Sequence, residues 1–387
     1  MKKICMRIGW WRPAVLAACL AASARGQGDV TPPGAGNLSL RPYIAVRGIH
    51  NSNLDATPDN EIGDGSAILE LGLDIENRTR LCMIDGCFWV LAEEYLDYTE
   101  RSHQDFGNRM SVRLWERERL LVVLNQRYED RTASDVAAGS IEGWQEGEVS
   151  VLLGKRLTDK LDGDLAYRYR DVRYDADRLF DWNQQTADFT LGHDMTERTV
   201  GTLLLRAGRQ ASDGNSTDAD FGVIHLGVTT RNSRKLTGAI GAGWHYHDVE
   251  PAISTPSVDA KVTWRPREQL AVDLSVLRTV EPARQDRENY NTPTRTALGL
   301  HYSPVKAITV SAIGMYARNE YDRPVTVDGV ARDKQDDTWT GLLRCTYRPD
   351  QQRLELFGEA KTETRESTLD TNDYDMLALS LGARYQY

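Results

Sequence analysis

Two histidines near the middle of the chain are the first residues that could carry chemistry. His245 and His247 are two residues apart, and Asp248 follows them directly. Residues i and i+2 of a β-strand point to the same face, so both imidazoles could bind one metal ion or serve one hydrolytic site. A zinc site needs three or four ligands, however, and this pair supplies at most half of them. We therefore predict no metal site and expect both histidines to line a polar surface.

Other enzyme motifs are missing or misplaced. The chain has no Gly-x-Ser-x-Gly motif of a hydrolase. Gly238, Gly241 and Gly243 fall inside an alternating segment, whereas a dinucleotide-binding loop joins a strand to a helix. The net charge of -10 disfavours non-specific binding to the phosphates of nucleic acids. The sequence thus predicts a protein that is not an enzyme, has no cofactor and binds no nucleic acid. A hydrolase built on the two histidines is kept as an alternative.

Cysteines could supply a covalent link. Cys82 and Cys87 flank Met83-Ile84-Asp85-Gly86, a segment typical of a tight turn with Asp-Gly at its tip. Paired across such a turn, they could form a short-loop disulfide in an oxidising compartment, or they could stay free thiols. We predict the disulfide between Cys82 and Cys87, and a free thiol at Cys345.

The first 24 residues have the three-part pattern of a secretory signal peptide. Basic residues lead into the short apolar stretch Pro13 to Ala22, and Ala22-Ser23-Ala24 is a small-x-small cleavage site. Leu16-Ala17-Ala18-Cys19 resembles the lipobox of bacterial lipoproteins, so lipidation of Cys19 is an alternative. We predict a cleaved signal peptide at 1–24, a periplasmic segment at 25–37 and one folded domain at 38–387.

Apolar and polar residues alternate from Leu38 to the end. In one example, Leu270, Val272 and Leu274 interleave with Ala271 and Asp273. Successive side chains of a strand point to opposite faces, so each segment has an apolar face and a polar or small face. The charged face cannot lie in a dry core. No apolar run approaches the roughly 20 residues of a membrane-spanning helix. One face of each strand must therefore meet water, and the other must meet something apolar.

Aromatic residues at the strand ends indicate what that apolar neighbour is. A soluble sandwich would pack two apolar faces together, whereas a transmembrane barrel would turn them all toward lipid. Aromatic rings with a polar edge prefer the membrane–water boundary, which favours the barrel. The residues expected at that boundary are Tyr167, Tyr169, Trp244, Tyr246, Trp264, Tyr302, Tyr347, Tyr385 and Tyr387.

The spacing of turns predicts how the strands are connected. Short polar turns and longer hydrophilic connections alternate, which is the layout of outer-membrane barrels. The short turns are expected near Arg117, Thr158, Arg198, Asn232, Pro266, Pro304 and Pro349. Strand centres are expected near residues 44, 72, 92, 112, 124, 149, 167, 189, 205, 224, 241, 261, 274, 298, 313, 342, 358 and 381. We predict an all-β, closed antiparallel up-and-down transmembrane barrel of about 18 strands (16–18), with both termini on one rim. A soluble propeller or sandwich is the alternative.

The polar faces of these strands would line the interior. Barrels of this size leave a water-filled lumen, and charges on its wall bias which ions pass. Arg168, Arg170 and Arg173 are expected to form a basic stripe. The predicted lumen-lining residues are Asp162, Asp164, Arg168, Arg170, His245, His247, Asp273, Arg295, Glu355, Glu359 and Lys361.

Both ends of the predicted barrel resemble known proteins. Tyr385-Gln386-Tyr387, preceded by Leu377, Leu379 and Leu381, resembles the last strand of Gram-negative outer-membrane proteins, which the assembly machinery reads. Arg41-Pro42-Tyr43-Ile44-Ala45-Val46 and then His50-Asn51-Ser52-Asn53 resemble the opening of the putative β-barrel porins of the second type, some of which are linked to exopolysaccharide operons. The resemblance implies the outer membrane as location, with membrane lipid and the assembly machinery as partners. Porins commonly form trimers, so the resemblance also leaves a homo-oligomer as an open alternative.

Strand number and a polar inner face together favour one function. The leading hypothesis is a channel for diffusion of small hydrophilic solutes through the outer membrane. An accessory barrel for exopolysaccharide export is the second hypothesis.

Overall fold

The computed structural model describes most of the chain. It covers residues 37–54, 56–57, 61–79, 82–116, 120–135, 140–175, 181–212, 218–230, 235–249, 252–282, 290–321, 324–327, 330–349, 353–368 and 373–387. The predicted signal peptide, the alternative lipidation site Cys19 and the N-terminal segment up to residue 36 lie outside these ranges. So do the predicted turn positions Arg117 and Asn232.

Nearly all of the described chain is β-strand. The one helical element among the described residues is a single 3-10 turn, η1 (Thr99–Arg101). The strands are β1 (Asn37–Asn51), β2 (Asp64–Arg78), β3 (Cys82–Tyr95), β4 (His103–Glu116), β5 (Leu120–Asp135), β6 (Ser140–Thr158), β7 (Leu161–Tyr174), β8 (Trp182–Asp194), β9 (Thr199–Ser212), β10 (Ala219–Thr230), β11 (Leu236–Asp248), β12 (Ile253–Arg267), β13 (Leu270–Arg278), β14 (Glu281–Pro282), β15 (Tyr290–Val305), β16 (Ile308–Tyr321), β17 (Val325–Val327), β18 (Val330–Arg332), β19 (Gln335–Tyr347), β20 (Leu354–Ser367) and β21 (Tyr374–Gln386).

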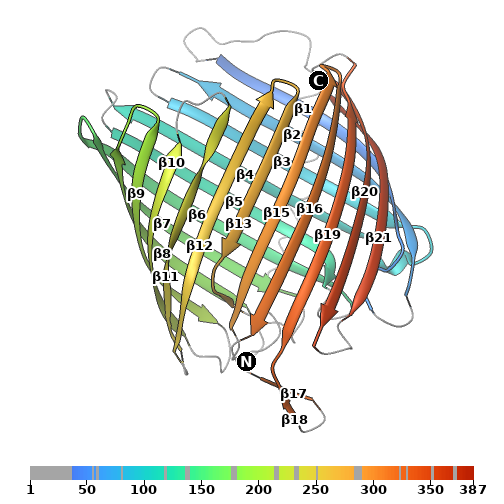
Figure 1. Ribbon diagram of the computed structural model, residues 1–387. Helices are drawn as coiled ribbons and strands as arrows, with labels where there is room; N and C mark the ends of the chain where they lie inside the picture. Colours follow the sequence, from blue (N-terminus) through green and yellow to red (C-terminus); the bar gives the residue numbers. More distant parts are fainter. Residues whose placement is uncertain are drawn as a thin grey trace, which may run out of the picture.

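The sheet closes on itself. Each long strand pairs antiparallel with the strand before and after it, and β1 pairs with β21, with Tyr43 opposite Gln386. β13 and β14 both pair with β15, so together they count as one strand of the barrel. The result is a closed up-and-down barrel of eighteen strands (Figure 1), which confirms the predicted fold. Each of the predicted strand centres lies within one of the observed strands.

The two rims differ in the length of their connections. The rim at the top of Figure 1 holds the short turns, including two-residue turns between β6 and β7, β12 and β13, and β15 and β16. Asn37 pairs with Arg78 and Tyr387 bonds to Pro42, so β1 begins and β21 ends at this same rim, as predicted. The hairpin β17–β18 extends from the opposite rim, at the bottom of Figure 1.

Two predicted proline turns end in a bulge. The register of β12 and β13 shifts between Trp264 and Arg267, around Pro266. The register of β15 and β16 shifts in the same way between Tyr302 and Val305, around Pro304. Proline has no N–H to give to the ladder, so a strand tolerates it best where pairing is already interrupted.

The large apolar side chains lie mostly on the outside. Leu381 is 74% exposed and Leu226 is 65% exposed, and leucines of many other strands are exposed in the same way. The buried hydrophobic cluster found among the described residues is small, formed by Ala219, Ile253, Val280 and Tyr290. Such an outer surface is stable only against an apolar neighbour. In the described ranges, no helix has the length and apolar character needed to cross a membrane.

The predicted disulfide is wrong. Cys82 and Cys87 both lie within β3, where the chain runs straight through the expected Asp85-Gly86 turn. The two residues are five apart, so their side chains point to opposite faces, and their Cα atoms are roughly 16 Å apart at the rise of an extended strand. A disulfide requires Cα atoms within about 7 Å. Cys82, Cys87 and Cys345 are all free thiols.

Candidate functional site: the inner wall of the barrel

The two faces of β7 define the inside and the outside of the barrel. Leu165, Tyr167 and Tyr169 are exposed on one face, among the apolar residues of the outer surface. Arg168 and Arg170 point the other way and pair with glutamates of β6 across the inner wall. Arg173 has the parity of the outer face, where it pairs with Asp171 at 2.9 Å, so it does not belong to the basic stripe that the sequence predicted.

The strand register shows which residues of every other strand lie on the inner or the outer face. Because directly opposite residues share a face, each strand can be assigned from its neighbour. Every predicted lumen-lining residue then falls on the inner face. These are Asp162, Asp164, Arg168 and Arg170 of β7, His245 and His247 of β11, Asp273 of β13, Arg295 of β15, and Glu355, Glu359 and Lys361 of β20.

Most of these charges have partners on a neighbouring strand or close by on their own. Arg170 Nε lies 3.0 Å from Glu146 Oε1, and Arg295 Nη1 lies 2.6 Å from Glu281 Oε1. Similar pairs join Arg168 to Glu148, Arg344 to Glu355 and Glu359, Lys361 to Glu363, and His301 to Asp273. The wall therefore carries interlocked positive and negative groups, not one dominant charge.

The predicted boundary aromatics all have the parity of the outer face. Trp244 and Trp264 are about half exposed there, and Trp244 Nε1 donates a hydrogen bond to Ser254 Oγ at 2.7 Å. Tyr385 and Tyr387 form an edge-to-face pair at the end of β21, with ring centroids 4.8 Å apart. Rings with a wet edge and an apolar body suit the surface of a membrane.

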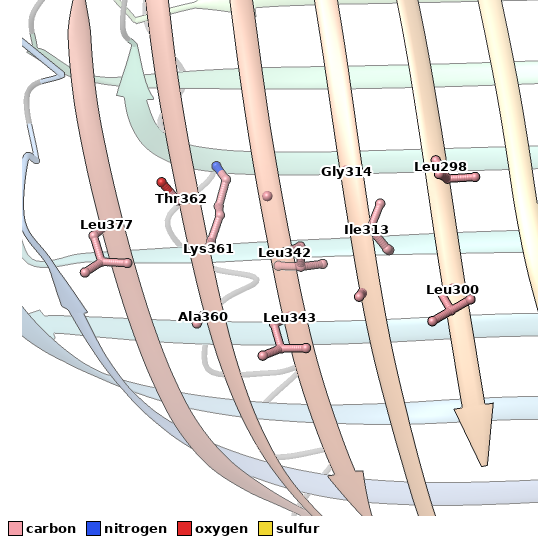
Figure 2. A pocket seen from close by; sticks show the side chains of 12 residues that line it. Leu298, Leu300, Ile313, Gly314, Leu342, Leu343, Ala360, Lys361, Thr362 and Leu377 are labelled. Atoms are coloured by element: carbon pink, nitrogen blue, oxygen red, sulfur yellow. The ribbon is translucent and has the colours of Figure 1, made fainter. Parts of the chain in front are cut away.

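A shallow apolar groove lies on the outer face of β15, β16, β19, β20 and β21. The groove is bordered by Leu298, Leu300, Leu343 and Leu377, and small residues such as Gly314 form its base (Figure 2). Its volume is about 520 Å³. Leucine, alanine and glycine residues form most of its lining, and Thr362 adds a hydroxyl group. Such a lining agrees with an outer surface that faces lipid.

The two histidines of β11 belong to a larger ring cluster. His225 of β10 lies 6.0 Å from His245, and His245 lies 6.1 Å from His247, measured between ring centroids. Phe221 stacks on His247, and the Tyr290 ring is tilted against His247, with ring centroids 5.5 Å apart. The sequence did not point to His225, because only strand pairing brings it to this place.

This cluster lacks the features of a reactive site. His247 is 4% exposed, and Ser257, which is hydrogen-bonded to His225, is 1% exposed, so a substrate could not reach the serine hydroxyl. Within the described ranges, no group of three or more His, Cys, Asp or Glu side chains is arranged to hold a metal ion. In this structure the three histidines lie in the inner wall of the barrel.

The sequence as a whole matches one protein family. A family model described as "Putative beta-barrel porin 2" covers residues 34–387. The chain belongs to this family. Membership in a porin-like barrel family agrees with the closed barrel and its apolar outer surface, and both identify an outer-membrane β-barrel. No curated protein matches the chain.

Solved barrels share the fold of this family member at very low identity. OpdK of Pseudomonas aeruginosa, solved with vanillate, matches with a TM-score of 0.50 and 10% identity over 92% of this chain and 100% of that one. A mutant of the ferric enterobactin receptor PfeA of Pseudomonas aeruginosa matches with a TM-score of 0.52 and 7% identity over 91% of this chain and 81% of the receptor. At these identities the likeness concerns the fold alone.

Proposed function

We propose that this porin-family barrel is a water-filled channel through which small hydrophilic solutes diffuse across the outer membrane. The observation that carries the proposal is the contrast between the two faces of every strand. The outer face presents exposed leucines to lipid, whereas the inner face presents ion pairs, such as Arg170 with Glu146 of β6 and Arg344 with Glu355 of β20. An interior built from charged groups needs water, and eighteen strands leave room for it.

The paired charges favour a channel with modest selectivity. A solute crossing this wall meets both signs within a few ångströms, as at Arg344 with Glu355 and Glu359. Dipolar and hydroxylated molecules can exchange water for such groups at little cost, because both donors and acceptors are present. We propose that the predicted lumen-lining residues contact the passing solutes.

Export and assembly form part of the same proposal. The segment 1–24 acts as a signal peptide that is removed after Ala24, and the assembly machinery of the outer membrane reads the C-terminal strand β21.

Conductance of the refolded protein tests the channel. The barrel is first identified by its change in gel mobility on boiling, since a closed barrel stays folded in detergent until heated. Insertion into a planar lipid bilayer should then produce stepwise increases in current. A protein that shows the boiling shift yet inserts without current is a sealed barrel, and the proposal would be rejected.

A further inference from the structure

One pocket of the inner wall contains charged and polar side chains that have no ion-pair or hydrogen-bond partner among the described residues. It lies across β1 to β6, has a volume of about 610 Å³, and is lined largely by charged and polar side chains. Ser111 of β4 is one of its lining residues, with Asp85 of β3 opposite it on one side and Asn125 of β5 on the other. Arg109 and Arg113 flank Ser111 along β4, two residues away in each direction.

Two like charges face each other in this pocket. Arg109 lies directly opposite Arg127 in the pairing of β4 with β5. Cross-strand pairs of the same charge destabilise a sheet unless something neutralises them. Arg127 is already held by Glu129, with Nε and Nη2 each 2.9 Å from a carboxylate oxygen. Arg109 has no hydrogen-bond or ion-pair partner among the described residues, and it is exposed to the pocket.

Other groups of the pocket are also left unsatisfied. Arg113 is exposed and, within the described part of the chain, forms no ion pair or hydrogen bond. The Oγ atom of Ser111 is buried and has no hydrogen-bond partner there either. Asn125 donates through Nδ2 to Ser150 at 3.1 Å, which leaves its carbonyl oxygen available. Asp85 forms no ion pair with any described residue.

These free groups fall into a definite pattern. Arg109 and Arg113 of β4 offer the forked donors that match an oxyanion such as a carboxylate. On the two strands beside β4, Asp85 and the Asn125 carbonyl oxygen are acceptors, which match hydroxyl donors. The other acids that line this pocket have partners, since Glu76 pairs with Arg41 at 2.8 Å, Glu148 lies 3.5 Å from Arg168, and Asp74 lies 3.5 Å from Arg384.

We propose that this pocket is a binding subsite for small hydroxylated carboxylates, with Arg109 and Arg113 holding the carboxylate and Asp85 and Asn125 accepting hydrogen bonds from the hydroxyl groups. The inference deepens the proposed channel function, because it names the class of solute that the inner wall selects. It also runs against the net charge of the chain, which by itself would favour cations.

Equilibrium dialysis of labelled glucuronate against the detergent-solubilised barrel tests the subsite without requiring any current. Glucose is the matched neutral probe, because it has a hydroxymethyl group where glucuronate has a carboxylate. Cyclohexanecarboxylate is the matched probe without hydroxyl groups. Glucuronate should bind at least about tenfold more tightly than either probe, since each charge-assisted hydrogen bond is worth more than a factor of ten.

Variants locate the binding. Arg109→Gln combined with Arg113→Gln should weaken glucuronate binding at least about tenfold. Arg173→Gln is the control for the arginine-to-glutamine change itself, because it removes one positive charge from an outer-face residue that pairs with Asp171. Each variant is checked for the boiling shift. Should the double variant fail to fold, the single Arg113→Gln variant and competition by KCl on the unaltered protein replace it, and both should lower binding.

The possible results separate the two proposals. Equal binding of glucuronate and glucose, or unchanged binding in the arginine variants, would overturn the subsite. Conductance without glucuronate binding leaves the channel in place and removes the subsite. Glucuronate binding by a barrel that carries no current supports the subsite and rejects free diffusion as the function.

Discussion

The ring of Tyr43 lies flat across Gly72 on the neighbouring strand. The two residues are directly opposite each other in β1 and β2, and the ring fills the space where a side chain of residue 72 would begin. Tyr43 donates a hydrogen bond through its hydroxyl to Glu70 at 2.7 Å, and Arg384 of β21 lies over its ring. Trp89 over Gly107, Phe221 over Gly208 and Phe357 over Gly382 repeat the arrangement. Aromatic side chains of the inner wall are thereby held against the wall.

Replacement of Gly72 by alanine should therefore destabilise the barrel. The new methyl group would collide with the Tyr43 ring, and overpacking of this kind costs about 1–3 kcal/mol. Urea unfolding in phospholipid vesicles, followed by tryptophan fluorescence, gives the change in free energy. Gly48→Ala is the control, since a Cβ atom at Gly48 would have no atom within 4 Å. Equal stability of the two variants would show that the ring does not depend on the glycine.

A charge on the outer face should be costly only at membrane depth. Leu381 lies near the middle of β21 and is 74% exposed, so Leu381→Arg would place a guanidinium in lipid at a cost of about 2–4 kcal/mol. Leu96 is exposed to a similar degree but lies beyond the end of β3. Leu96→Arg should change the unfolding free energy by less than about 1 kcal/mol. Both values come from unfolding in vesicles, and equal losses would contradict a lipid neighbour for Leu381.

Asp336 should contribute strongly to the stability of the barrel at the rim from which β17–β18 extends. It is fully buried, accepts hydrogen bonds from Tyr321 and Ser367, and pairs at 2.5 Å with Arg365, whose side chain is 10% exposed. Asp336→Ala would leave the Arg365 charge without a partner, which costs about 3–5 kcal/mol. The same unfolding measurement applies. Asp218→Ala removes the partner of the exposed Arg209 and should have little effect. The prediction fails if the two alanine variants are equally stable.

The native cysteines should report which face meets water. Cys345 is more exposed than Cys87 in the isolated molecule, but Cys345 lies on the outer face, whereas Cys87 lines the pocket of the inner wall. In lipid vesicles, a charged maleimide should modify Cys87 and leave Cys345 unmodified, because lipid covers the outer face. Mass spectrometry of two variants measures this, one with Cys82→Ser and Cys345→Ser, the other with Cys82→Ser and Cys87→Ser. Faster labelling of Cys345 would contradict the assignment of faces.

The strands could be predicted from the sequence because most positions obey one constraint. Lipid on one side and water on the other impose alternation of apolar and polar residues along a strand, as at Leu270 to Val276. A strand can therefore be recognised from its own sequence, even when the strands that pair with it are unknown. The count of strands and the common rim of the termini follow from the same pattern. Parity within a strand also determines the face of the charged and aromatic candidates, and the prediction was wrong for Arg173 because its odd parity places it with Tyr167 and Tyr169 on the outer face.

The expected turn at Asp85-Gly86 failed because local residue preference competes with strand pairing. Asp-Gly favours a turn when nothing else acts on it, but Ile75 of β2 and Met110 of β4 pair with Gly86 and keep it in the sheet. The alternation is also blurred there, since Met83 and Trp89 place apolar side chains on the inner face. The wrong disulfide followed directly from this turn.

The pocket around Ser111 could not be predicted from one strand. Its groups come from β3, β4 and β5, and the opposition of Arg109 and Arg127 depends on the register of a hairpin whose turn lies several residues away. The same is true of His225 beside His245. Sequence patterns assign a side chain to a face, but only pairing decides which side chains meet across it.

The seam between β1 and β21 has a consequence for the order of assembly. Tyr43 meets Gln386, so the first strand finds its second neighbour only when the last residues of the chain have arrived. Until then, both outermost strands present unpaired N–H and C=O groups that would readily join a foreign strand. The unfinished polypeptide must therefore be kept apart from its own copies, and a protein truncated shortly before its C-terminus would leave the edge of β1 open to association with other chains.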